Sequence, residues 1–138
     1  MDRLTTQLPA VAAAPGVVRG WLRDALHAWS MESASAVMEL LATEIVTNVV
    51  QHVHQPMTVR IMRDGSVLRL EVDDASPVLP ACYPPDPTDD HHRGMFIVES
   101  LSSHWGATSH SDDGKTVWFE LDLAGFGSDG AASRDVND

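Results

Sequence analysis

The sequence holds one cysteine and few basic residues. Cys82 has no second cysteine to pair with, so the chain can form no intrachain disulfide. Nine lysine and arginine residues stand against twenty aspartate and glutamate residues, which gives a net charge of −11. Because nucleic-acid binding depends on basic side chains that neutralise phosphates, this balance argues against a nucleic-acid partner. It suits solubility, or a protein partner with a basic surface.

Long apolar runs are also missing. We find no run of the ~20 residues that a membrane-spanning helix needs, and we expect no membrane association. The N-terminus has an early Asp2 and no sustained apolar block, which makes it a poor secretory signal. We therefore expect a cytoplasmic protein. The 138 residues, 43 % of them hydrophobic, suit a single domain with one core.

Hydrophobic periodicity predicts the secondary structure. A helix with apolar positions at helical spacing is expected at 17–29, and a second, capped by Ser33 or Ser35, runs to about His54. Strands are expected at 57–63 and 67–73, joined by a turn at Asp64-Gly65. The remaining predicted elements are a strand at 4–8, a helix at 94–103 with Met95, Ile97, Val98 and Leu101 inward, and strands at 107–110 and 116–123.

Two segments break this pattern. Residues 74–93 contain five prolines and no apolar periodicity, so this connection is expected to be functional or disordered. Residues 125–138 are rich in Gly, Ser and Asp and predict a disordered acidic tail. The order of elements predicts an α+β domain over 1–124. We expect a two-layer sandwich, with the helices on one face of a mixed, mostly antiparallel sheet.

Three polar residues interrupt the apolar second helix. In the stretch TEIVTNVVQHV, Glu44, Asn48 and His52 lie one turn apart, at the border of the buried arc. One interpretation is that border positions simply tolerate polar side chains. The other is a functional site, because carboxylate and amide oxygens suit Mg²⁺ and a glutamate can deprotonate a nucleophile.

Later motifs have the features of a nucleotide pocket. A carboxylate such as Asp74 at a strand end can accept a hydrogen bond from an exocyclic amine, or can start a turn. Arg93-Gly94 opens a helix, where free N–H groups favour phosphate, although an ordinary junction has the same pattern. Gly114-Lys115-Thr116 opens the last strand; it is not a P-loop, since a strand follows it.

These motifs, in this order, resemble the GHKL ATPase superfamily, and within it the stand-alone anti-sigma-factor serine kinases of bacteria. ATEIVTNVVQH is similar to their N-box and GKTVWFELDL to their final strand, and the similarity covers about residues 4–123. The resemblance implies a Bergerat-type fold that binds ATP and Mg²⁺. Family members are commonly dimers, so it implies a homodimer. A chain this short leaves no room for a sensor or dimerisation domain, which favours the same branch.

The resemblance also implies roles for single residues. Glu44 matches the catalytic base that activates a partner's serine hydroxyl, and Asn48 matches the Mg²⁺ ligand. His52 matches the last N-box position, near the nucleotide. Asp74 matches the aspartate that reads adenine, and Ser76 stands at the first glycine of a D-x-G-x-G motif.

The remaining implied contacts lie after the proline-rich segment. Arg93, Gly94 and Met95 match the phosphate-binding turn that follows the lid, and Thr116 matches the threonine that assists adenine recognition. His92 stands where the family usually has a glycine. Glycine permits backbone conformations and close ligand approach that other residues resist.

Three functions follow as hypotheses. The first is an ATP-dependent kinase that binds a sigma factor and phosphorylates a serine on its anti-anti-sigma antagonist. The second is a non-catalytic binding module of the same fold, suggested by Ser76, Val78 and His92 at glycine positions. The third is a metal-dependent hydrolase using the stretch 89–92, since Asp and His are zinc ligands.

Overall fold

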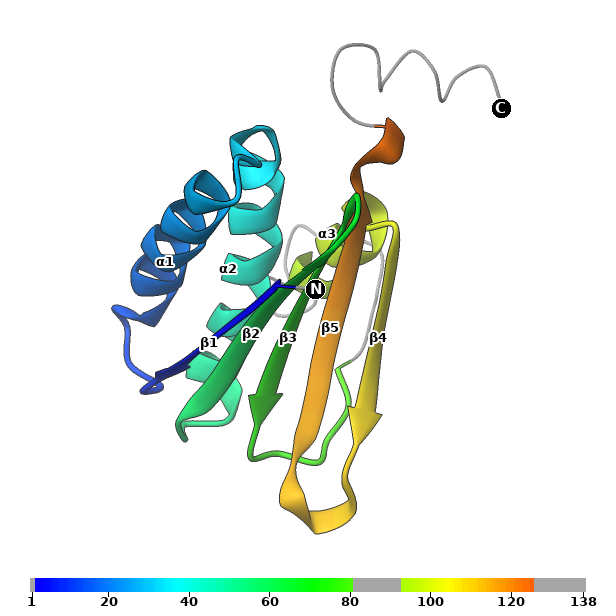
Figure 1. The fold of residues 1–138 in the computed structure, drawn as a ribbon. Helices are drawn as coiled ribbons and strands as arrows, with labels where there is room; N and C mark the ends of the chain where they lie inside the picture. The colour runs from blue at the N-terminus through cyan, green and yellow to red at the C-terminus, as the bar shows by residue number, and fades with distance from the viewer. Residues whose placement is uncertain (1, 81–92, 126–138) are drawn as a thin grey trace.

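Three helices pack on one face of a five-stranded sheet (Figure 1). The structure is a computed structural model and describes residues 2–80 and 93–125. The helices are α1 (Ala14–Ala28), α2 (Ser35–His52) and α3 (Arg93–Leu101). The strands are β1 (Asp2–Leu8), β2 (Met57–Asp64), β3 (Val67–Asp74), β4 (His104–Ser109) and β5 (Lys115–Asp122).

The sheet has the order β1-β2-β3-β5-β4, and every neighbouring pair is antiparallel. The α+β class is confirmed, but the expected mixed sheet is wrong for the strands described. The connections give the reason. Two helices join β1 to β2, so the chain reverses three times between these strands and β2 runs antiparallel to β1. The single helix α3 joins β3 to β4, but β5 lies between these two strands and pairs with each of them.

Helix α1 lies against α2 and covers the β1 side of the sheet (Figure 1). Pro15 occupies its first turn, where the missing N–H of proline costs nothing. Val18, Leu22 and Leu26 recur at helical spacing and are completely buried. This apolar face packs the helix onto the core.

Helix α2 begins without the serine cap that we expected. A 3₁₀ turn leads into it, so Ala34 is the N-cap residue and no side chain caps the helix. Ser35 is the first helical residue, and its hydroxyl donates to the carboxylate of Glu39 instead. The helix ends at His52, and His54 adopts a left-handed φ of 63° that stops it.

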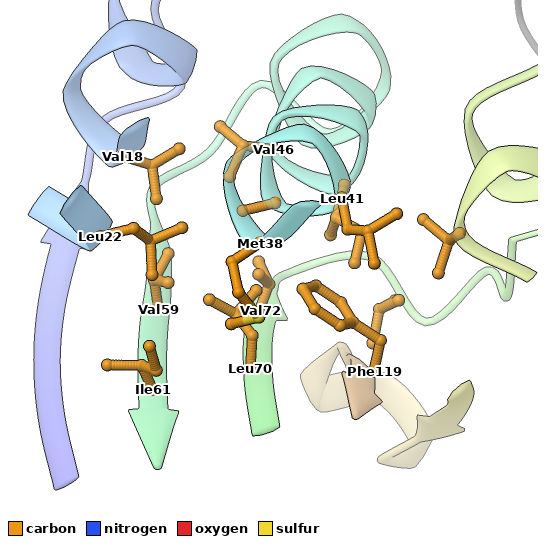
Figure 2. Packing of buried hydrophobic residues seen from close by; sticks show 14 of the residues in the cluster. Val18, Leu22, Met38, Leu41, Val46, Val59, Ile61, Leu70, Val72 and Phe119 are labelled. Atoms are coloured by element: carbon orange, nitrogen blue, oxygen red, sulfur yellow. The ribbon is translucent and has the colours of Figure 1, made fainter. Parts of the chain in front are cut away.

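The core lies between the helices and the inner face of the sheet. Figure 2 shows side chains of α1 and α2 meeting those of β2, β3 and β5. Among the described residues, Phe119 is the largest that is completely buried, and Trp21 and Trp29 are partly buried against the same core. Leu101 is 47 % exposed at the end of α3, so its predicted inward position is wrong.

Helix α2 is long and largely apolar. Among the described residues, the segment Glu32–His52 is long and apolar enough, by length and composition, to cross a membrane. This corrects our expectation that no such segment exists. The core helix of a globular protein passes the same test. In this fold Met38, Leu41, Ile45 and Val46 of the segment are buried in the core, which accounts for its apolar character.

The outer face of the sheet, away from the helices, carries a row of ion pairs. Arg60 donates to Asp73 at 2.8 and 2.9 Å and to Glu71 at 3.0 Å. Arg69 donates to Glu71 at 2.8 Å and to Glu120 at 2.9 Å. These half-buried side chains alternate along each strand with the buried apolar ones.

Trp118 also lies on this outer face. Its ring packs so closely on Gly106 of β4 that a Cβ there would lie 2.7 Å from the ring. The guanidinium of Arg69 lies 4.0 Å from the centroid of the same ring. The expected strands at 107–110 and 116–123 are confirmed as β4 and β5, with β4 starting earlier, at His104.

Candidate functional site

A cavity of about 410 Å³ opens between α2, the end of β3, α3 and the start of β5. It lies at one end of the fold, where the chain leaves β3 for the segment that leads to α3. Its walls are mainly apolar, with a few polar groups among them. The lining residues are Ile45, Asn48, Val49, His52, Val53, Asp74, Ser76, Val78, Leu79, Pro80, Met95, Lys115 and Val117.

Helix α2 supplies one wall. Asn48 and His52 line the cavity one turn apart, as their spacing predicts. Ile45 and Val49 lie beside them and belong to the core, which fixes this side of the helix in place. The amide of Asn48 is half-buried and the imidazole of His52 is exposed.

Asp74 and Lys115 form the floor as a buried ion pair. Asp74 continues the inward alternation of Leu70 and Val72, which brings its carboxylate to the helix side of the sheet. Its side chain is 1 % exposed and that of Lys115 is 9 % exposed. The Lys115 ammonium donates to Oδ2 of Asp74 at 2.9 Å and to Oδ1 at 3.0 Å.

Ser76 shapes the wall next to this pair. Its backbone N–H donates to Oδ1 of Asp74 at 2.8 Å, and its carbonyl accepts a hydrogen bond from Lys115 at 3.3 Å. The Ser76 hydroxyl in turn accepts from the N–H of Val78 at 3.2 Å. These bonds hold the segment after β3 in a turn of the kind that aspartate and serine favour.

Gly114 makes the close packing of the floor possible. It has a φ of 109°, and a Cβ at this position would lie 2.0 Å from the carbonyl oxygen of Asp74. Only glycine fits such an approach. The turn before β5 therefore lies directly against the end of β3, and Lys115 follows it into the cavity.

Glu44 lies on α2 one turn before Asn48 and contacts the start of α3. A Cβ at Gly94 would lie 2.8 Å from Oε1 of Glu44, so glycine leaves the room that this carboxylate occupies. Gly94 is buried at the start of α3, and Met95 after it lines the cavity. Arg93 is the first residue of α3. Glu44 itself is half-buried and is not among the lining residues described.

Thr116 lies on the other face of the sheet from the cavity, in contrast to the role that the resemblance implies. Its hydroxyl donates to Oδ1 of Asp73 at 2.6 Å, and its oxygen lies 2.8 Å from Nε2 of His110. Thr116 pairs with Asp73 and Lys115 with Asp74, so neighbouring residues of β5 face opposite ways.

The motif comparison therefore missed Lys115, although the sequence held a signal. Val117, Phe119 and Leu121 are the buried positions of β5, and counting back by two reaches Lys115. Lys115 is also the chain's only lysine. The proposed zinc stretch at 89–92 lies outside the described residues. Within 2–80 and 93–125, no group of three or more His, Cys, Asp or Glu residues is arranged to hold a metal ion.

The fold is an α+β sandwich, and its cavity is lined by residues of the motifs on α2, at the end of β3 and on α3. These two features define the class of protein to which the chain belongs. The family model of the histidine kinase-like ATPase domain matches residues 7–121. The chain belongs to this family, which is part of the GHKL superfamily.

The solved structures similar to this chain include the histidine kinase domain from the blue-light activated histidine kinase of Erythrobacter litoralis EL346. The two are 19 % identical with a TM-score of 0.49, and the match covers 80 % of this chain. This chain spans 61 % of that domain's length. No curated protein matches the chain.

Proposed function

We propose that this domain binds Mg·ATP in the cavity and transfers the γ-phosphoryl group to a serine or threonine of a partner protein. One observation carries the proposal. The same cavity is lined by residues of α2, of the end of β3 and of α3, which were predicted from separate motifs. Its volume of about 410 Å³ falls in the range of roughly 300–1,000 Å³ that small-ligand sites occupy. Membership of the ATPase family supports the same ligand.

The lining suits the parts of a nucleotide. Ile45, Val49 and Val117 offer apolar surface to a flat base, and the carboxylate of Asp74 accepts a hydrogen bond from its exocyclic amine. The amide oxygen of Asn48 is a ligand type that Mg²⁺ accepts beside water and phosphate oxygens. Mg²⁺, when bound, supplies positive charge that neutralises the phosphates.

Glu44 is the base in this proposal. A bond forms between the partner's hydroxyl oxygen and the γ-phosphorus, and the bond from that phosphorus to the β–γ bridging oxygen breaks. The hydroxyl proton passes to the Glu44 carboxylate, and ADP leaves. The Glu44 carboxylate lies next to Gly94 at the start of α3, which is the end of the helix that favours phosphate groups.

The partners follow from the resemblance to anti-sigma-factor kinases. We propose a sigma factor as the protein that this domain holds and an anti-anti-sigma protein as the substrate. The net charge of −11 suits partners with basic contact surfaces. We further propose that the protein forms a homodimer and acts in the cytoplasm.

The test combines binding with transfer. Calorimetric titration with Mg·ATP is expected to give heat and a rise in melting temperature. Radiolabelled phosphate is then followed from ATP to a panel of anti-anti-sigma proteins. Glu44→Gln is expected to bind Mg·ATP but to transfer phosphate at least ~100-fold more slowly, since general base catalysis contributes factors of that size.

The matched control is Glu32→Gln, which removes an exposed carboxylate from the 3₁₀ turn before α2. It is expected to transfer at the wild-type rate. Transfer by Glu44→Gln at the wild-type rate would remove Glu44 from the role of base.

A second candidate is a binding module without catalysis. It is favoured by one observation: both oxygens of Asp74 already accept hydrogen bonds, from Lys115 and from the N–H of Ser76. Under this candidate Mg·ATP gives neither heat nor a thermal shift. Pull-down of a partner that is insensitive to ATP would then define its function.

A further inference from the structure

Lys115 brings an ammonium group into the base end of the cavity. It lies 2.9 and 3.0 Å from the two oxygens of Asp74, and both side chains are almost completely buried. Lys115 takes no part in the ion pairs of the outer face. It lies on the inner face of β5, and its side chain lines the cavity.

The ion pair places a donor beside an acceptor. An ammonium has three N–H donors, and an ionised carboxylate accepts about four hydrogen bonds. Of the bonds that Lys115 makes here, the one to the Ser76 carbonyl is the longest, at 3.3 Å. That bond is the one an oxygen on a bound ligand would most easily replace. The floor of the cavity is therefore able to accept one hydrogen bond and donate another, side by side.

The two purine classes place opposite groups at this position. Adenine has an amine at C6, which donates, beside a ring nitrogen that accepts; hypoxanthine and guanine have a carbonyl oxygen at C6 beside a ring N–H. A lone carboxylate that faces the C6 substituent binds the amine of adenine and repels the C6 carbonyl oxygen, because two acceptors would then face each other. A carboxylate with an ammonium beside it matches both edges, with donor and acceptor exchanged.

We propose that Lys115 is a specificity-determining residue that lets this cavity take 6-oxopurine nucleoside triphosphates as well as ATP. The inference rests on the proposed nucleotide binding. Sites that leave a buried polar group unpaired reject a ligand by roughly 10⁴-fold or more. The Lys115 ammonium donates to the C6 oxygen of a 6-oxopurine, so that oxygen is not left unpaired and the ligand is not rejected on that account.

Inosine triphosphate is the probe, since it differs from ATP only at this edge of the base. The affinities of the wild-type protein for Mg·ATP and Mg·ITP are measured by calorimetric titration. We expect a ratio within about tenfold, because each base edge finds one donor and one acceptor. An ITP affinity more than about 100-fold weaker than that of ATP would overturn the inference.

Lys115→Met tests the residue itself. It keeps the unbranched side chain apart from its terminal ammonium group, so the donor is removed and the ratio of ATP to ITP affinity is expected to rise by at least about tenfold. An unchanged ratio overturns the inference. Lys115→Arg keeps a charged donor and is expected to retain the wild-type ratio of ATP to ITP affinity. If Lys115→Met does not fold, the inference is tested by the ratios of the wild-type protein and of Lys115→Arg.

The control is Arg69→Met, which removes the same charge from the outer face of the sheet. It is expected to leave the ratio unchanged, and a change as large as that of Lys115→Met would overturn a local role for the lysine. Heat with ATP but not ITP contradicts this inference alone. No heat with either nucleotide contradicts the proposed function and the inference with it.

Discussion

Asp73 and Asp74 are neighbours in β3, yet their carboxylates lie on opposite faces of the sheet. Asp73 is bound by Arg60 and Thr116 on the outer face. Asp74 is bound by Lys115 in the cavity. The two neighbouring carboxylates therefore belong to separate groups of ion pairs, because successive side chains of a strand point to opposite faces of the sheet.

Amide substitutions distinguish the two carboxylates. Asp74→Asn leaves the buried ammonium of Lys115 without its counter-charge, so the free energy of unfolding is expected to fall by about 3 kcal/mol. Mg·ATP affinity is expected to fall at least about tenfold, since the acceptor for the base weakens. Asp73→Asn is expected to cost less than about 1 kcal/mol, because its ion pair is partly exposed, and to leave the affinity unchanged.

Urea unfolding and calorimetric titration of the two variants check this prediction. Equal losses of affinity in both would contradict the assignment of Asp74 alone to the cavity.

Acid is expected to weaken the outer face. Burial by itself raises the pKa of Asp73, but hydrogen bonds from Arg60 and Thr116 outweigh it and hold the pKa below its ordinary value of 3.8. Burial likewise raises the pKa of Glu71, and bonds from Arg69 and Arg60 bring it below 4.5.

A carboxyl group whose pKa is lowered by folding stabilises the protein fully when the pH is above the pKa of the unfolded state, which is 3.8 for Asp73 and 4.5 for Glu71. This contribution is lost as the pH falls through the lower folded values. Urea midpoints measured from pH 6 to pH 3 are expected to fall, and to fall less steeply in the Glu71→Gln/Asp73→Asn double variant. The same slope in both proteins would contradict the prediction.

Gly94→Ala is expected to separate stability from catalysis. The added Cβ would lie 2.8 Å from Oε1 of Glu44, so the end of this flexible side chain must move. Alanine in a helix is favoured over glycine by about 0.5–1 kcal/mol, which offsets the strain, and the melting temperature is expected to change little. Phosphate transfer is expected to fall by at least about tenfold, because a displacement of about 1 Å can cost ~100-fold.

Melting curves and single-turnover transfer assays measure the two effects. Ala13→Gly, just before α1 and not among the residues that line the cavity, is a control whose transfer rate is expected to match that of the wild type. Full transfer by Gly94→Ala would show that the position of the Glu44 carboxylate does not limit the reaction.

Gly114→Ala is expected to be much more damaging than Gly94→Ala. Its Cβ would lie 2.0 Å from the backbone oxygen of Asp74, and the φ of 109° is itself unfavourable for alanine. We expect a loss of about 3 kcal/mol or more, since strained backbone and steric overlap add. The matched control is Gly20→Ala in α1, where nothing lies within 4 Å, and a gain of about 0.5–1 kcal/mol is expected.

Denaturant unfolding of the two variants measures both changes. A loss below about 1 kcal/mol for Gly114→Ala would mean that the turn before β5 can move away from β3 at little cost.

Local patterns predicted most of this fold. The one-turn spacing of Asn48 and His52 placed both on the same cavity wall, and strand alternation explains why Asp74 faces inward. The antiparallel sheet was harder, because strand order depends on contacts between distant segments. Leu101 lay outside the core because α3 ends there, and periodicity alone does not locate the end of a helix.

The end of the cavity formed by Asp74 and Lys115 shows where motif comparison was insufficient. Matching the motif led to Thr116, whereas the register of β5 against β3 brings Lys115 beside Asp74. A one-residue step along a strand exchanges its two faces, so motif position alone did not decide which side chain enters the cavity.

The burial of Lys115 has a chemical consequence for the whole chain. No other residue carries an ε-amine, and this one lies inside the cavity with its side chain 9 % exposed. Lysine acetylation and isopeptide conjugation therefore have no target on the outer surface of the protein. A partner that meets a positively charged side chain there meets a guanidinium or an imidazolium group, and an acylating reagent that modifies lysine reports on access to the cavity.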